Sequence, residues 1–262
     1  MCKTLAGNDC EMLIITNFYS REEDIADWSA IIVSAWVHPG ESNASFIMEG
    51  IIEFLVSNDP NALKLWDKFV FKIVPMLNPD GVIIGNYWCS ISANDLNRQW
   101  SNPSNKYHPE IYATKTMIVK TLDSWRISFF CDIHGHSRSK NLFMYGCENK
   151  DEKSRLREKV FPLMFHKKCD GFDFDCCNFA IQKSKESTAW VVIWKRFNLV
   201  NSYTLECSFC GPTRGLYRDC HFTPSIMKDM GKSFCLNLID FTDREQKKFN
   251  SAYEELNLMF PK

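Results

Sequence analysis

Residues 30–41 read AIIVSAWVHPGE, an apolar run followed by a histidine, a Pro-Gly turn and a glutamate. A continuous apolar run rich in β-branched residues is typical of a strand buried on both faces. Such a strand delivers His38 to its carboxyl end, and the turn brings Glu41 back beside the imidazole. Because an imidazole and a carboxylate so placed form a local chelate, the segment predicts a central strand and part of a metal site.

The rest of the sequence alternates between strand-like and helix-like segments. Five other apolar runs resemble the first, at residues 12–16, 69–77, 127–133, 190–194 and 200–206. Apolar residues recur at helical spacing over residues 43–57, 112–124, 151–167, 223–240 and 243–258. This alternation predicts an α/β fold with a mixed β-sheet flanked by helices. No repeat, low-complexity tract or Pro/Gly/Ser-rich linker divides the sequence, so we expect a single domain over residues 1–262.

The composition favours a folded chain with no general affinity for polyanions. Of the 262 residues, 45% are hydrophobic, which suffices for a sizeable core. Lys and Arg number 31 against 32 Asp and Glu, so the net charge of -1 excludes a general attraction to nucleic acid or to an anionic membrane. The N-terminus lacks the pattern of a secretory signal, and no apolar run reaches about 18 residues. We therefore expect a soluble, cytoplasmic protein.

The sequence contains twelve cysteines, a number that would allow disulfides or a metal site. Disulfide scaffolds are short and secreted, whereas this chain can be stabilised by burial, so reduced thiols are expected. Cys207 and Cys210 form one CxxC motif, but a zinc ribbon needs a second. That motif follows an apolar run instead of opening a helix, unlike a thioredoxin motif. These two cysteines and the adjacent pair Cys176 and Cys177 are interpreted as structural thiols.

The segment CDIHGH (131–136) supplies the third ligand that a catalytic zinc site needs beside one open position. His134 ends an apolar run, and the carboxyl ends of neighbouring strands meet at one edge of an open α/β sheet. Glu206 closes another run on that edge and is the candidate general base. Asp132 is expected to point to the strand face opposite His134, which leaves it a weak role in orienting that ligand.

Each motif alone has a plainer interpretation. The HPGE segment is compatible with a turn that carries a surface glutamate, and HGH with a loop of hydrogen-bonded histidines. Their joint occurrence at strand ends, with Glu206 at a third, favours zinc. Of the other histidines, His136 is open between a substrate contact and a structural role, whereas His108, His166 and His221 are interpreted as surface or core residues.

Several longer segments resemble the cytosolic carboxypeptidase family, a branch of the zinc carboxypeptidases that includes tubulin deglutamylases. They are HPGESN (38–43), FVFKIVPMLNPDGVIIGNY (69–87), DLNRQW (95–100), CDIHGHSRSKNLFMYGC (131–147) and NSYTLECSFCG (201–211). The resemblance runs from about Leu5 to Phe241. It implies one zinc ion per chain, held by His38, Glu41 and His134.

The resemblance also implies the remaining roles. Glu206 is the catalytic base, and Asn97 and Arg98 hold the free C-terminal carboxylate of the substrate. A planar guanidinium suits that task because it offers paired hydrogen bonds to a carboxylate. The expected activity is zinc-dependent removal of C-terminal amino acids, above all glutamates, from protein tails such as those of tubulin.

The chain departs from the family pattern at four tryptophans. Trp88 stands where relatives carry an Arg that stabilises the oxyanion, and Trp190 where they carry an Arg that favours glutamate. Trp36 and Trp66 also replace the usual Arg. We hypothesise either a systematic coding difference, because Arg CGG and Trp TGG codons differ by one base, or drift toward a protein without catalysis. Reduced activity is expected from the loss at Trp88, since one oxyanion donor is worth about a hundredfold in rate.

Two alternative functions stay open. One is an impaired pseudo-carboxypeptidase that binds acidic C-terminal tails, and the other is a zinc amidohydrolase of the deacylase type. The family also places an N-terminal β domain, and then a first strand and helix, before the peptidase segment in which Met1 lies. We therefore expect residues 1–262 to be a catalytic domain that lacks those parts.

Overall fold

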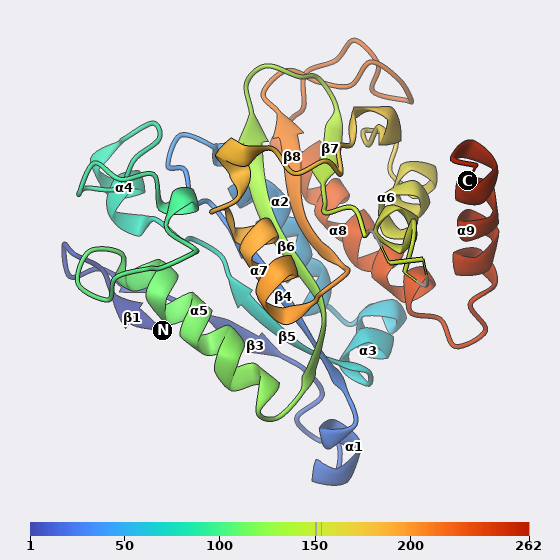
Figure 1. The fold of residues 1–262 in the computed structure, drawn as a ribbon, viewed down its shortest axis with the longest axis horizontal. Helices are drawn as coiled ribbons and strands as arrows, with labels where there is room; N and C mark the ends of the chain where they lie inside the picture. The colour runs from blue at the N-terminus through green and yellow to red at the C-terminus, as the bar shows by residue number, and fades with distance from the viewer. Residues whose placement is uncertain (150, 153, 262) are drawn as a thin grey trace.

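The computed structural model describes residues 1–149, 151–152 and 154–261. Its centre is a six-stranded mixed sheet (Figure 1). In spatial order the strands are β3 (Leu13–Ile15), β5 (Phe69–Val74), β4 (Ser29–Ala35), β6 (Arg126–His136), β8 (Ser202–Ser208) and β7 (Leu142–Tyr145). The four inner strands run parallel, and β3 and β7 pair antiparallel at the two edges.

Helices cover both faces of this sheet (Figure 1). On one face pack α2 (Ser42–Leu55), α3 (Pro60–Trp66), α6 (Arg157–Lys168), α8 (Pro224–Phe241) and α9 (Lys247–Met259). On the other face pack α5 (Pro109–Leu122) and α7 (Ala189–Phe197). The predicted mixed sheet flanked by helices is therefore confirmed.

Short elements complete the fold. A two-stranded hairpin pairs β1 (Cys2–Lys3) with β2 (Asp9–Cys10). The short helices are α1 (Glu22–Ala26) and α4 (Pro79–Ile84), and 3-10 turns lie at Leu96–Arg98, Phe174–Cys176 and Lys183–Lys185. Among the described residues, no helix combines the length and the apolar character needed to cross a membrane.

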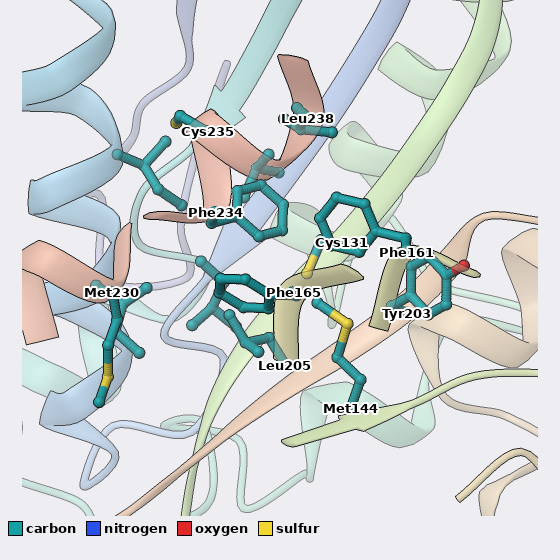
Figure 2. Packing of buried hydrophobic residues seen from close by; sticks show 14 of the residues in the cluster. Cys131, Met144, Phe161, Phe165, Tyr203, Leu205, Met230, Phe234, Cys235 and Leu238 are labelled. Carbon is teal, nitrogen blue, oxygen red and sulfur yellow. The ribbon is translucent and has the colours of Figure 1, made fainter. Parts of the chain in front are cut away.

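The two faces of the sheet bury different side chains because neighbouring residues of a strand point to opposite sides. Along β4, Ile31 and Val33 enter the core under α2 and α8, whereas Ile32 enters the core under α5 and α7. Figure 2 shows the first core, where the ring of Phe161 packs against both Phe234 of α8 and the sheet residue Tyr203. The sheet is thus fixed from both sides.

One predicted element has the wrong type. Residues 190–194 were expected to form a strand but lie inside α7. A short apolar run cannot distinguish a buried strand from a buried helix by itself. The helix places Ala189 and Ile193, which lie four residues apart, in one core. Of the predicted helix 151–167, residue 153 lies outside the described residues, and the helix begins at Arg157.

Candidate metal centre and active site

The first two candidate ligands lie in the connection from β4 to α2. Trp36 has a φ of 60°, which bends the chain after the strand, and His38 and Glu41 follow in the turn. The backbone N–H of Glu41 donates to the His38 carbonyl at 3.1 Å and closes this turn. A Cβ on Gly40 would lie 2.5 Å from the Tyr87 ring, so only glycine fits between the turn and that ring. The turn therefore holds both side chains at the sheet edge.

The other two residues lie on neighbouring parallel strands. His134 of β6 pairs in register with Glu206 of β8, so the two side chains leave the sheet side by side. His134 is 2% exposed and Glu206 8% exposed. Both follow buried runs, and both end at the edge where the β4 turn lies. The structure thus brings together the four residues that the sequence predicts as ligands and base.

The ligand atoms of the three predicted metal-binding residues converge on one point. His38 Nδ1 lies 2.9 Å from Glu41 Oε1, His134 Nδ1 lies 3.0 Å from Glu41 Oε2, and the two Nδ1 atoms are 3.2 Å apart. Ligands of a tetrahedral zinc ion with bonds of 2.0–2.1 Å are about 3.3 Å apart, close to these values. We call His38, Glu41 and His134 the metal cluster, and its geometry fits zinc.

The outer nitrogen of each histidine faces a carboxylate. His134 Nε2 lies 2.8 Å from Asp132 Oδ2, and His38 Nε2 lies 3.2 Å from Asp95 Oδ1. Donation of the Nε2 proton to these carboxylates leaves Nδ1 as the acceptor that can bind a metal. The expectation for Asp132 is wrong, because residues two apart in a strand share a face. Sequence reasoning assigned no role to Asp95, although it opens the DLNR motif.

The electrostatics of the metal cluster favour a cation. Burial opposes ionisation of Glu41, yet hydrogen bonds from His134 and His38 lower the pKa of its carboxyl to about 2. Burial likewise opposes ionisation of Asp95, but its bond to His38 lowers that pKa to about 2. The carboxylates in turn raise the pKa of both histidines against the effect of burial. The negative charge of Glu41, together with that of Asp95 and Asp132 behind the two imidazoles, favours a divalent metal at the metal cluster.

Glu206 differs from the other carboxyl groups of the site. It lines the cavity next to the metal cluster, and burial raises its pKa to about 7, the effect of Glu41 adding to that of burial and His134 opposing it. The carboxyl group of Glu206 has no hydrogen-bond partner among the described residues, whereas that of Glu41 also accepts from the backbone N–H of Gly135 at 2.9 Å. A carboxyl group that is held near the metal cluster and is free of partners is suited to accept and donate protons.

The metal cluster lies in a cavity of about 450 Å³. Asn97 lines it and is held in place, because its Oδ1 accepts from the backbone N–H of Ala189 at 3.1 Å and its amide lies 3.4 Å from His134 Nε2. Arg98 lines it as well, with its guanidinium 3.6 Å from Asp95 Oδ2. Both predicted carboxylate-binding residues therefore face the cavity that contains the metal cluster.

The two tryptophans lie in different surroundings. Trp88 lines the cavity, stacks on the His38 ring at a centroid distance of 3.7 Å, and donates its indole N–H to Asp95 Oδ2 at 3.0 Å. Trp190 is only 4% exposed and is not among the cavity-lining residues. It lies behind Tyr145, which does line the cavity, with ring centroids 6.4 Å apart. A direct substrate contact by Trp190 has no support from this position.

Three further residues with basic side chains line the cavity. His136 lines it, with Nδ1 accepting from the backbone N–H groups of Arg138 at 3.2 Å and Ser139 at 3.0 Å. Arg138 and Lys185 also line it, and sequence reasoning named neither. Lys185 lies close enough to lower the pKa of both Glu206 and His136. We call Trp88, Arg138 and Lys185 the outer wall of the cavity.

Comparison with known sequences agrees with this site. Residues 1–214 match the zinc carboxypeptidase family. The chain is 48% identical over 257 residues to "Cytosolic carboxypeptidase 2" of Mus musculus, with 98% of this chain and 30% of the relative covered. It is 42% identical over 262 residues to "Cytosolic carboxypeptidase 3" of Bos taurus, with 99% and 26% covered. The chain thus spans less than a third of the length of these relatives.

Solved structures share the fold. A metallo-carboxypeptidase from Burkholderia cenocepacia superposes with a TM-score of 0.78 at 25% identity, covering 91% of this chain and 62% of that one. Carboxypeptidase A from Helicoverpa armigera superposes with a TM-score of 0.64 at 16% identity, covering 95% and 66%. At the latter identity the likeness concerns the fold alone.

Proposed function

This chain belongs to the zinc carboxypeptidase family, and from that membership we propose that it is a zinc-dependent hydrolase that removes C-terminal residues from polypeptides. The observation that carries the proposal is the convergence of His38, Glu41 and His134 on one point inside a cavity that Arg98 also lines. A metal cluster alone suits many hydrolases. A guanidinium in the same cavity adds a binding group for the free carboxylate at the end of a peptide.

Each residue of the site then has a chemical task. Zinc, when bound by the metal cluster, supplies a Lewis acid that activates water and polarises a carbonyl. Arg98 and the fixed amide of Asn97 bind the terminal carboxylate and so place the last peptide bond near the metal cluster. Glu206 takes the proton of the attacking water and passes it to the leaving amine. Asp95 and Asp132 keep the ligand histidines oriented.

The charge of the cavity supports a preference for acidic ends. Besides Arg98, it is lined by Arg138 and Lys185, which have no carboxylate partner within ion-pair distance among the described residues. These cations offset the charge missing at Trp190. We therefore propose glutamate as the favoured terminal residue, with tails such as those of polyglutamylated tubulin as substrates. By analogy with the cytosolic carboxypeptidases, the proposed compartment is the cytoplasm.

The test is a measurement of zinc content alongside hydrolysis of peptides that end in Glu, Asp, Lys and Phe. We expect about one zinc per chain and the fastest release of Glu. The Glu206→Gln variant serves as the control that keeps the metal but lacks the base. Tight binding of the Glu peptide by zinc-loaded protein without any cleavage would establish the tail-binding alternative instead.

A further inference from the structure

Two cysteines face each other in the N-terminal hairpin, away from the metal cluster. Cys2 of β1 and Cys10 of β2 are direct partners in the antiparallel register. Residues opposite one another in such a pair have Cα atoms about 4.5–5.5 Å apart. Disulfides accept Cα separations of about 4.4–6.8 Å. The hairpin therefore holds the Cα atoms of the two cysteines at a separation that a disulfide accepts, without a shift of the backbone.

The two thiols differ in access and in acidity. Cys10 is fully buried, whereas Cys2 is partly exposed to solvent. The neighbouring Cys10 side chain lowers the pKa of Cys2, whereas Cys2 and burial raise the pKa of Cys10, whose thiol lies 3.6 Å from the Met76 carbonyl. The accessible sulfur is thus the better nucleophile, and the buried thiol stands beside it. A reactive cysteine next to a resolving cysteine is the arrangement in which oxidation ends in a disulfide.

We propose that Cys2 and Cys10 are an oxidative modification site, which a peroxide converts to an intramolecular disulfide. In the first step the Cys2 thiolate attacks a peroxide oxygen, giving a sulfenic acid and hydroxide. In the second step the Cys10 thiol attacks the Cys2 sulfur, and the S–O bond breaks to release water. The peroxide is reduced by two electrons and the two thiols are oxidised by two.

Other cysteine pairs lack this arrangement. Cys176 contacts the side chains of Asn141 and Asp173, whereas the neighbouring Cys177 accepts from the backbone N–H of Met144 at 3.3 Å. The Cys177 thiol also donates to the backbone carbonyl of Asp173 at 3.7 Å, so each of these adjacent thiols bonds to surrounding groups and not to the other thiol. Cys89 is partly exposed like Cys2 but belongs to no strand that would place a second thiol opposite it. Cys89 is accordingly the matched control.

The modification acts on a loop that supports the cavity. Within the hairpin, the Thr4 hydroxyl, the Ala6 backbone N–H at 2.9 Å and the Asn8 amide at 2.8 Å all donate to the carboxylate of Asp80 in α4. The segment after α4 leads to Trp88, which stacks on His38. A disulfide across residues 2 and 10 closes this loop covalently and so holds the loop around Asp80. We expect it to stabilise the fold and to leave the metal cluster intact.

The test maps thiols in the 262-residue chain after reduction, removal of the reductant and exposure to hydrogen peroxide. Free thiols are blocked with iodoacetamide, and the protein is digested with trypsin. The expected product joins residues 1–3 to residues 4–21 and is two hydrogens lighter than the two reduced peptides together. A melting temperature about 5 °C higher than that of the reduced protein is also expected.

Two variants distinguish oxidation at Cys2 and Cys10 from non-specific oxidation of other cysteines. In Cys10→Ser, Cys2 should stop at a sulfenic acid that dimedone traps, and the temperature shift should vanish. In Cys89→Ser, the linked peptide and the shift should persist. The proposal is overturned if peroxide takes Cys2 of the unmutated chain to a sulfinic acid, or if Cys2 is linked to a cysteine other than Cys10. An equal melting temperature of oxidised and reduced protein would refute the stabilising role.

Discussion

The metal cluster and the outer wall belong to one cavity but are held in different ways. The residues of the metal cluster come from strand ends or the turn after β4, are buried, and have partners on each side. The outer wall comes from connecting segments, and its members include a tryptophan 38% exposed and two cations without carboxylate partners among the described residues. In the proposed function, the sheet therefore positions the catalytic groups, and the loops are expected to determine which chain end is accepted.

This difference indicates where sequence change is tolerated. A substitution in the metal cluster leaves a buried imidazole or carboxylate without its partner, which is costly. A substitution in the outer wall changes charge at a solvent-facing surface. Trp88 illustrates the second case, since its indole N–H satisfies Asp95 although it brings no positive charge. Effects of mutations should therefore decrease from the metal cluster outward.

The largest catalytic effect is expected for Glu206→Gln. The amide is nearly isosteric but cannot accept the proton of the attacking water, so kcat should fall about a thousandfold. Zinc content should stay at the wild-type level because Glu206 is not in the metal cluster. Steady-state kinetics and metal analysis of the same preparation check both points. Retention of more than a tenth of the activity would show that another group is the base.

A smaller loss is expected for Arg98→Met. Removing a charged hydrogen-bond donor should lower kcat/KM about a hundredfold for peptides with a free C-terminus. The matched control is Arg126→Met, at the exposed start of β6, which should leave the kinetics unchanged. If the two variants had equal kinetics, Arg98 would not be the carboxylate-binding residue.

The orienting carboxylate should affect the metal more than the chemistry. Asp132→Asn removes the charge that faces His134 Nε2, so zinc affinity should fall about tenfold to a hundredfold. Competition with a fluorescent zinc chelator measures the affinity. Asp59→Asn, at the start of α3, preserves a helix cap far from the metal cluster and should bind zinc normally. Equal affinities would mean that Asp132 has a packing role only.

The smallest effect is expected at the outer wall. Trp88→Arg should raise kcat about tenfold, with a smaller change in KM, because a charged donor near the cavity stabilises developing negative charge. The gain is smaller than the roughly hundredfold effect of a full oxyanion donor because Asp95, which accepts from the Trp88 indole, would pair with part of the added charge. Trp66→Arg makes the same exchange at an indole that donates to the Leu55 carbonyl, and it should not change kcat. An unchanged kcat in Trp88→Arg would show that positive charge at this position does not stabilise the oxyanion.

The site residues at the strand ends could be predicted from the sequence, whereas two residues of the outer wall could not. His38, His134 and Glu206 could be placed because each follows an apolar run, and parallel strands end at a common edge. Lys185 and Arg138 could not, since only the folded connections bring them to the cavity. The position of Asp132 could have been predicted from the sequence, because strand periodicity puts it on the same face as His134. The apolar run at residues 190–194 was assigned to a strand because its periodicity does not separate a strand from a helix.

The most direct test compares two peptides that end in Glu and differ only by amidation of the C-terminus. Mass spectrometry follows their incubation with zinc-loaded chain, with and without a zinc chelator. We predict that the free acid loses its terminal residue, that the amide stays intact, and that the chelator stops the reaction. Equal cleavage of both peptides, or no zinc-dependent cleavage of the free acid, would contradict a carboxypeptidase built on His38, Glu41 and His134.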